Sequence, residues 1–158
     1  KYRIIIMTTA HFKYFQAQRL NVINVSSSRT LLPEISGSIL ILDNSSSAIE
    51  ITLPKPESGL HYKFIIKTKN DNTSVANDIT IKSTSNDISS SPLIYFTGVS
   101  GMGTTLGTQY SAGVTNNITK SSVTINNFVI SGDRLEFITD GENWYGTGVT
   151  KHNAITFT

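Results

Sequence analysis

The chain has 158 residues, a formal net charge of +2, 38% hydrophobic residues and no cysteine. This length fits one domain, and the absence of cysteine excludes disulfides, thiolate metal sites and a cysteine nucleophile. The small net charge, with the basic residues scattered, argues against nucleic-acid binding. Only 15% of residues are charged, and serine and threonine make up about a quarter of the chain. Such a composition favours strands and turns over long helices.

Residues 1–32 differ from the rest of the chain and are predicted to form an N-terminal arm that serves for attachment. Within them, Arg3–Met7 and Leu20–Val25 have the character of strands, His11–Gln18 fits either a short helix or an extended arm, and residues 26–28, all serine, fit a linker. Because the apolar side chains of the arm need cover, we expect them to pack on a neighbouring subunit or on another protein of the same assembly. The residues of this expected interface are Ile4, Ile5, Ile6, Phe12, Tyr14 and Phe15.

Residues 33–158 are predicted to form a β-sandwich domain, in which the strands are dense from Gly37 onward. Apolar and polar residues alternate in short segments separated by turn residues, which is the period of half-buried strands. Asp140-Gly141 predicts a hairpin between two of these strands. No helix of ordinary length is expected after residue 20. The expected fold is an antiparallel β-sandwich of jelly-roll type, with strands at 38–43, 49–53, 60–66, 79–81, 93–97, 123–130, 134–139, 144–149 and 154–157.

The sequence contains no motif that indicates catalysis. The glycine-rich stretch 98–117 lacks the Gly-Lys-Ser/Thr ending of a phosphate-binding loop, and Ser100 is followed by Met102 where a nucleophile elbow needs glycine. The three histidines are dispersed, and the carboxylates fall mostly where turns need them. No apolar stretch approaches the ~20 residues of a membrane span. We therefore expect no enzyme, no cofactor, no metal and no membrane span.

Three aromatic residues are the candidates for contact with a ligand: Tyr110, Trp144 and Tyr145. Tyr110 belongs to the glycine-rich stretch, which we expect to be a long exposed loop. The adjacent Trp144 and Tyr145 place one ring on each face of a strand, so one of the two should lie on the less buried side. Packing at a protein interface is the favoured interpretation of that ring, and contact with a sugar is the alternative.

Two stretches carry a resemblance to a known class of proteins. They are IEITLPKPESGLHYKFIIKT at Ile49–Thr68 and GDRLEFITDGENWYGTG at Gly132–Gly148. An "ITLP" strand leading through a glycine turn to an aromatic strand resembles structural proteins of phages and large DNA viruses. So does a strand followed by Asp-Gly and a strand that opens with Trp-Tyr. The resemblance covers about a third of the chain and supplies no catalytic residues.

The resemblance implies a trimeric jelly-roll or sandwich domain of a virion. The protein is then expected to be a homotrimer that binds other capsid proteins as a minor capsid, cap or decoration component. The alternative is a receptor-binding head of a fibre or tail that recognises a host glycan or a host surface protein. The two share one fold, so the fold alone does not decide between them.

Overall fold

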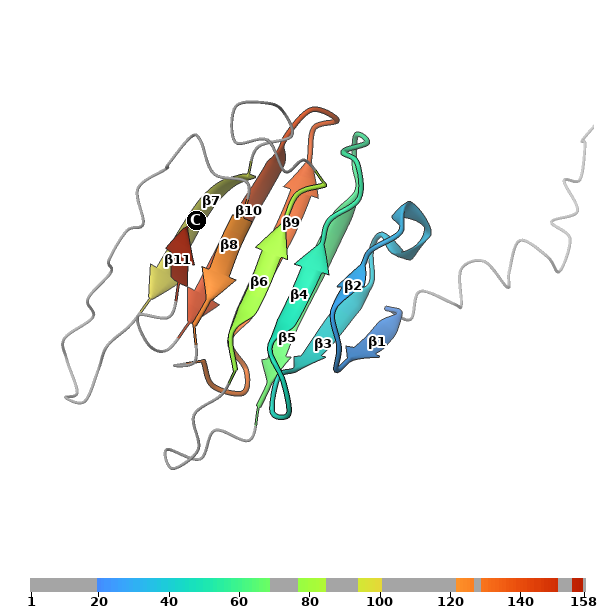
Figure 1. Ribbon diagram of the computed structural model, residues 1–158. Coiled ribbons are helices and arrows are strands. Elements are labelled where there is room, and N and C mark those ends of the chain that lie inside the picture. Colours follow the sequence, from blue (N-terminus) through green and yellow to red (C-terminus); the bar gives the residue numbers. More distant parts are fainter. Residues whose placement is uncertain are drawn as a thin grey trace, which may run out of the picture.

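The computed structural model describes residues 20–68, 77–84, 94–100, 122–126, 129–150 and 155–157. In these ranges the chain forms two β-sheets that face one another (Figure 1). A short 3₁₀-helix, Pro33–Ile35, is the helical element of the described part of the chain. No helix within it is long and apolar enough to cross a membrane.

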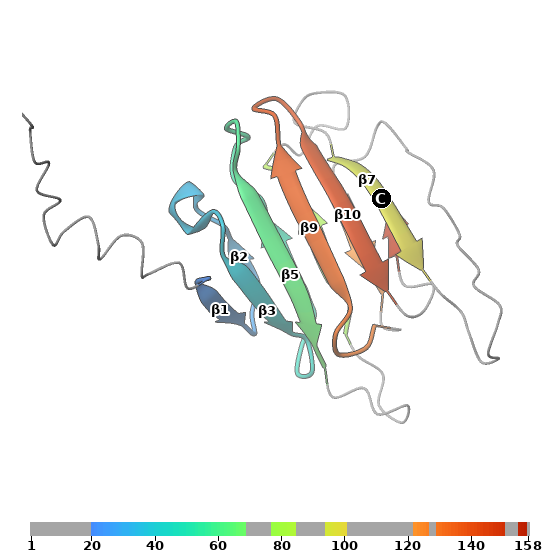
Figure 2. The same cartoon turned by 180° about the vertical axis from the view of Figure 1, so that it is seen from behind.

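Each sheet has an order that mixes early and late parts of the chain. Sheet A has the order β1-β3-β5-β9-β10-β7, and sheet B has the order β11-β8-β6-β4-β2. Figure 2 shows sheet A from its outer side, with β1 at one edge and β7 at the other. The strands of sheet A are β1 Val22–Val25, β3 Ile39–Asp43, β5 His61–Lys67, β7 Ile94–Ser100, β9 Arg134–Thr139 and β10 Trp144–Thr150. Those of sheet B are β2 Arg29–Thr30, β4 Ile49–Thr52, β6 Ile79–Lys82, β8 Ser122–Ile125 and β11 Ile155–Phe157.

The chain passes from one sheet to the other at every connection between consecutive strands except the β9–β10 hairpin. In the first six strands this winding is regular. β1, β3 and β5 pair in parallel in sheet A, while β2, β4 and β6 pair in parallel in sheet B. The first half of the domain is thus a flattened coil in which each turn contributes one strand to each sheet. In the second half, β8 pairs antiparallel with β6 and β9 pairs antiparallel with β5.

The expected all-β fold is confirmed, but the antiparallel jelly-roll arrangement is not, because both sheets are mixed. Five of the nine strand pairs are parallel. Alternation along a strand specifies which side chains face inward, but the same alternation suits either direction of the neighbouring strand. Direction was set here by connections that cross between the sheets rather than by hairpins. The hairpin expected at Asp140-Gly141 is present, joining β9 to β10.

The segment expected to be an arm contributes two strands to the sheets. β1 and β2 both lie within residues 1–32, and they pair with β3 and β4. The strand expected over Leu20–Val25 is therefore present as β1, whereas the two-residue strand β2 had no counterpart among the expected strands. The other strand expected in this segment, Arg3–Met7, and the stretch His11–Gln18 lie outside the described residues.

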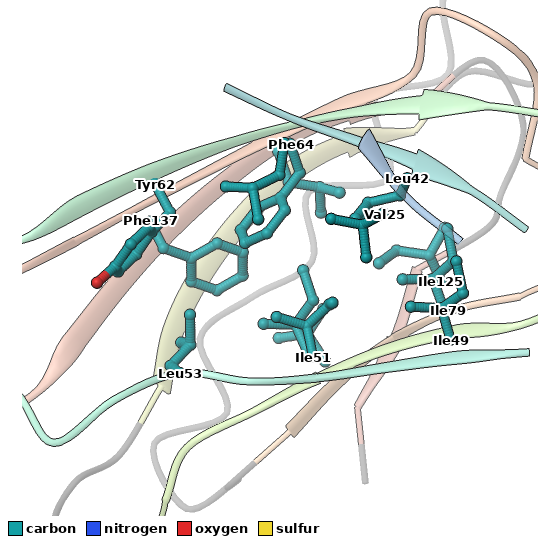
Figure 3. Packing of buried hydrophobic residues seen from close by; sticks show 14 of the residues in the cluster. Val25, Leu42, Ile49, Ile51, Leu53, Tyr62, Phe64, Ile79, Ile125 and Phe137 are labelled. Carbon is teal, nitrogen blue, oxygen red and sulfur yellow. The ribbon is translucent and has the colours of Figure 1, made fainter. Parts of the chain in front are cut away.

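The core lies between the two sheets and is formed by the inward-facing residue of each alternating pair (Figure 3). In sheet B, Ile49, Ile79 and Ile125 are paired across three neighbouring strands and are all buried. In sheet A, Phe64 and Phe137 meet edge to face with ring centroids 5.8 Å apart. Figure 3 shows these isoleucines on the side of Val25 and Leu42, while Leu53 lies nearer the aromatic rings of Tyr62 and Phe137. Side chains from both sheets thus fill the space between them.

A reciprocal pair of asparagines joins two successive turns of the coil. Asn44 follows β3 and is buried, and its side-chain amide donates to the backbone carbonyl of Asn77, just before β6. The side-chain amide of Asn77 donates in return to the carbonyl of Asn44 at 2.9 Å. The backbone leaves the strands at this point, so without the two side chains these backbone carbonyls would lack hydrogen-bond partners. The pair therefore satisfies both carbonyls and holds the two turns in register.

Candidate contact face

Sheet A has an outer face that carries several apolar side chains among polar and charged ones. Its side chains are those that alternate with the buried residues of β3, β5, β9 and β10. We call them the A face: Ile39, Ile41, Asp43, His61, Lys63, Ile65, Lys67, Arg134, Glu136, Ile138, Tyr145, Thr147 and Val149. Ile138, Tyr145 and Val149 are 51%, 42% and 46% exposed. Three of the six large hydrophobic residues exposed among the described residues thus lie on β9 and β10.

The strand register gathers most of these apolar side chains into two rows. Ile41 is paired with Ile65, Ile65 with Arg134, and Arg134 with Val149. One row across four strands is therefore apolar except for a single guanidinium. On the row toward the β9–β10 hairpin, Ile138 is paired with Tyr145. Neighbouring strands lie about 5 Å apart, so the side chains within each row are neighbours. Between the two rows lies a third, formed by Ile39, Lys63, Glu136 and Thr147.

The outer face of sheet B has the opposite character. Its outward side chains in β4, β6 and β8 are Glu50, Thr52, Thr80, Lys82, Ser122 and Thr124. The hydroxyls of Thr80 and Thr124 lie 3.3 Å apart, and Lys82 pairs with Glu50 at 2.7 Å. Every side chain of this set is polar, as expected for a sheet face that water covers. Both sheets bury apolar side chains on their inner faces, so the contrast between the two lies in their outer side chains. This difference points to a contact made by sheet A.

The A face is hollowed at its centre. A partly open depression of roughly 500 Å³ lies over β3, β5, β9 and β10. Its lining includes the side chains of Ile39, Ile65, Arg134, Thr147 and Val149. A depression of this kind accepts a protruding side chain from another molecule and excludes water around it, which is how well-packed protein contacts obtain much of their affinity.

The charges on the A face are arranged in pairs at its rim and centre. Lys63 pairs with Glu136 at 3.4 Å, and Lys67 pairs with Asp43 at 3.2 Å. A hydrogen bond from the Ser45 side chain and the nearby Lys67 ammonium hold the pKa of Asp43 below its ordinary value. Arg134 has no ion pair within the part of the chain that the structure describes. The paired charges leave the apolar row beside them free for contact.

Tyr145 stands at the hairpin end of the A face and is held in place there. Its hydroxyl donates to Asp140 Oδ2 at 2.8 Å, while Asp140 Oδ1 accepts from the backbone amides of Glu142 and Asn143 at 2.8 and 2.9 Å. The hydrogen bonds from Asn143, Glu142 and Tyr145 lower the pKa of Asp140. The carboxylate thus orders both the turn and the exposed ring, which costs the ring less conformational entropy when it makes a contact.

Trp144 lies on the other side of the same strand, in the core. It is fully buried, and its ring centroid is 5.8 Å from that of Tyr62. The expectation that one ring of the Trp-Tyr pair faces outward is met by Tyr145. Tyr110 and the expected interface residues of the arm lie outside the described residues.

The described residues bring together no arrangement that indicates chemistry. They contain no group of three or more histidine, cysteine, aspartate or glutamate residues placed to hold a metal ion. Tyr62 has a strongly shifted pKa, raised to about 12 chiefly by burial and further by Glu34 and Glu57. Its hydroxyl donates to the Leu32 carbonyl at 3.0 Å, so it ties the first turn of the coil to β5. That role is structural.

The apolar character of the A face was only partly visible in the sequence. Ile65 between Phe64 and Ile66, and Ile138 after Phe137, break the alternation by being apolar on the outward phase. These departures from alternation were the signal in the sequence that the outer face of sheet A carries apolar side chains. Their convergence required the register between strands that are far apart in the chain.

Comparison with known proteins gives no relative from which a function could be transferred. No family model, no curated protein and no solved structure matches this chain. The function is therefore argued from the two sheet faces and from the residues that form them.

Proposed function

We propose that the protein is a structural component of a virus particle that binds neighbouring protein subunits through the A face. The observation that carries the contact role is the contrast between the two outer faces. One has a depression and six apolar side chains among its polar ones, and the other carries polar side chains alone on β4, β6 and β8. The viral role comes from the two stretches that resemble phage and large-DNA-virus structural proteins. It places the protein in the virion as a minor capsid, cap or decoration component.

The chemistry of the A face suits a protein partner better than a small molecule. Its depression is partly open to solvent, while small-molecule sites usually enclose most of the ligand's surface. The exposed residues are aliphatic and tyrosine side chains, flanked by Lys63, Glu136 and Arg134. The apolar rows lie on either side of the central Lys63–Glu136 pair, so a partner that presents both apolar and charged side chains would match this face.

The proposed assembly is a homotrimer docked among other capsid proteins. A domain without cysteines depends on packing alone, and open sheet edges are stabilised when neighbouring subunits cover them. The number three follows from the resemblance. The antiparallel jelly-roll form of such domains is likewise a property of the proteins resembled, and the mixed sheets of this chain are a variation on the two-sheet sandwich.

The test is incorporation of tagged full-length protein into particles of the virus that encodes it. Particles are separated from unassembled protein on a density gradient, and the tag is quantified in each fraction. The contact variant is Ile138→Lys with Val149→Lys, and the matched control is Thr52→Lys with Thr124→Lys on sheet B. Both add the same charge at outward positions, and such substitutions usually change folding stability by no more than about 0.5 kcal/mol.

We expect the wild type and the control in the particle fraction. The amount of the contact variant in that fraction should be at least about tenfold lower, which corresponds to about 1.4 kcal/mol of binding free energy. Absence of the wild-type protein from particles would refute the viral role. Equal incorporation of all three would show that the A face makes no contact.

A receptor-binding head is the second candidate, favoured by the ordered, exposed ring of Tyr145. If the protein binds host glycans, Tyr145→Ala should abolish binding on a glycan array, because a sugar would stack on that ring. Tyr145→Phe should retain the binding, since it keeps the stacking surface. Glycan binding lost in Tyr145→Ala but kept in Tyr145→Phe, from a protein at the tip of a fibre, would replace the first proposal.

A further inference from the structure

The strand at one edge of sheet A, β1, presents an open edge without the usual protection. It is the terminal strand of the sheet and pairs with β3 alone among the described strands (Figure 2). Sheet edges exposed to water are commonly protected by charged residues or proline. Residues 20–28 contain neither, and Leu20 and Val22 are 65% and 55% exposed.

The hydrogen bonds of β1 reveal which of its backbone groups face the open side. Ile39 N–H donates to the carbonyl of Asn21 at 2.8 Å, and Val22 is the residue paired with Ile39. In a parallel pair, alternate residues of a strand direct both backbone groups to the same neighbour. Asn21 and Ile23 therefore direct their backbone hydrogen-bonding groups toward β3. Val22 and Asn24 direct their N–H and C=O groups away from it.

We propose that this edge pairs with the same edge of a second copy of the chain, antiparallel and about a two-fold axis. Val22 of each copy then lies opposite Asn24 of the other, and Ile23 lies on the axis. This register is the one that lets both open residues of each strand exchange their backbone hydrogen bonds. It joins two six-stranded sheets into one continuous sheet.

Charge and packing favour a second copy as the occupant. In this register Ile23 meets its own equivalent and Val22 lies opposite Asn24, so an edge with charges of one sign at these positions would repel its copy. β1 carries no charge, whereas the neighbouring edge of sheet B, β2, contains Arg29. Ile23 is partly buried against the core, and its meeting with Ile23 of the second copy would extend that core across the axis.

The pairing also changes the A face. Val22 is paired with Ile39, so its exposed side chain continues the outward row of β3. Two copies joined at β1 would therefore present two A faces side by side. That consequence rests on the proposed function, but the pairing itself does not. A two-fold contact at β1 uses a different surface from a trimer contact elsewhere, so the two are compatible.

The first test measures the mass of the full-length protein in solution by light scattering. In the proposed register, Val22→Lys with Asn24→Lys places like charges opposite one another, and the mass should fall to half that of the wild type. Val22→Lys with Asn24→Asp places opposite charges across the axis, and the wild-type mass should be retained. Circular dichroism establishes that both variants are folded. Equal masses for the two variants would overturn the proposal.

The second test uses the absence of native cysteine. Ile23→Cys places two thiols opposite one another on the axis, at a separation that a disulfide can span. Mild oxidation should convert most of the protein to a covalent dimer, while Thr80→Cys, on the outer face of sheet B, should not cross-link. An Ile23→Cys protein that cross-links no more than the Thr80→Cys control would refute the pairing. Particle incorporation that still depends on Ile138 and Val149 would leave the proposed function standing in that case.

Discussion

The pair of phenylalanines at the junction of the two halves of the domain allows a sharp test of the fold. Phe64 on β5 belongs to the parallel coil, and Phe137 on β9 begins the antiparallel part. Their rings meet edge to face at 5.8 Å in a site where both are fully buried. On the outer side of the same two strands, Lys63 pairs with Glu136 at 3.4 Å, with both side chains about half exposed. One strand pair therefore presents two contacts in two environments.

We predict unequal coupling free energies for these two contacts in double-mutant cycles. Phe64→Leu and Phe137→Leu should each destabilise the protein by about 1 kcal/mol, because the volume change is modest. The coupling between them should be about 0.5–1.5 kcal/mol, the usual value for an aromatic pair beyond its burial. Lys63→Gln and Glu136→Gln should couple by no more than about 0.5 kcal/mol, because water screens half-exposed charges.

Urea unfolding followed by tryptophan fluorescence measures both cycles, since Trp144 is buried in the same core. Unchanged dependence on urea would show that the variants keep the compactness of the native and unfolded states. If the phenylalanines prove additive within error, or if the ion pair couples more strongly than the rings, then Phe64 and Phe137 do not make the edge-to-face contact described.

Two further predictions concern Tyr62 and the β9–β10 hairpin. The folded state holds the proton of Tyr62 more tightly than the unfolded state, since burial raises the pKa from 10.0 to about 12. The free energy of unfolding should therefore fall as the pH rises from 10 to 12. The loss should reach up to about 3 kcal/mol, at ~1.4 kcal/mol per pH unit. Tyr62→Phe should remove this dependence on pH, and it should cost about 1 kcal/mol of stability at neutral pH because the hydrogen bond to Leu32 is lost. Parallel pH profiles for the two proteins would contradict the assignment of the pH dependence to Tyr62. Gly141 has a φ of +108°, and an added Cβ would lie 3.4 Å from the Ser58 amide nitrogen, so Gly141→Ala should cost about 1–3 kcal/mol. Gly59→Ala, at a φ of +86° with open space around it, should cost less in the same thermal unfolding experiment, and the reverse order would be evidence against the described turn.

The sequence was sufficient for most of the strands and for the side of each that is buried, although not for the two-residue strand β2. Ile49, Ile51 and Leu53 alternate with polar residues, and the hydrophobic effect is sufficient to bury these apolar side chains. The turns were legible for a similar reason: Gly141 after Asp140 permits a positive φ that other residues rarely adopt. These features depend on neighbours in the chain, so the chain itself specifies them.

The direction of pairing and the contact face depended on tertiary structure. Alternation fits a parallel or an antiparallel neighbour equally well, and here the chain crosses between sheets often enough to make the first six strands a parallel coil. The row of Ile41, Ile65, Arg134 and Val149 draws its members from positions up to 108 residues apart (149 minus 41), and no local pattern could have joined them. Local free energies select strands and turns, whereas long-range pairing selects which outward side chains become neighbours.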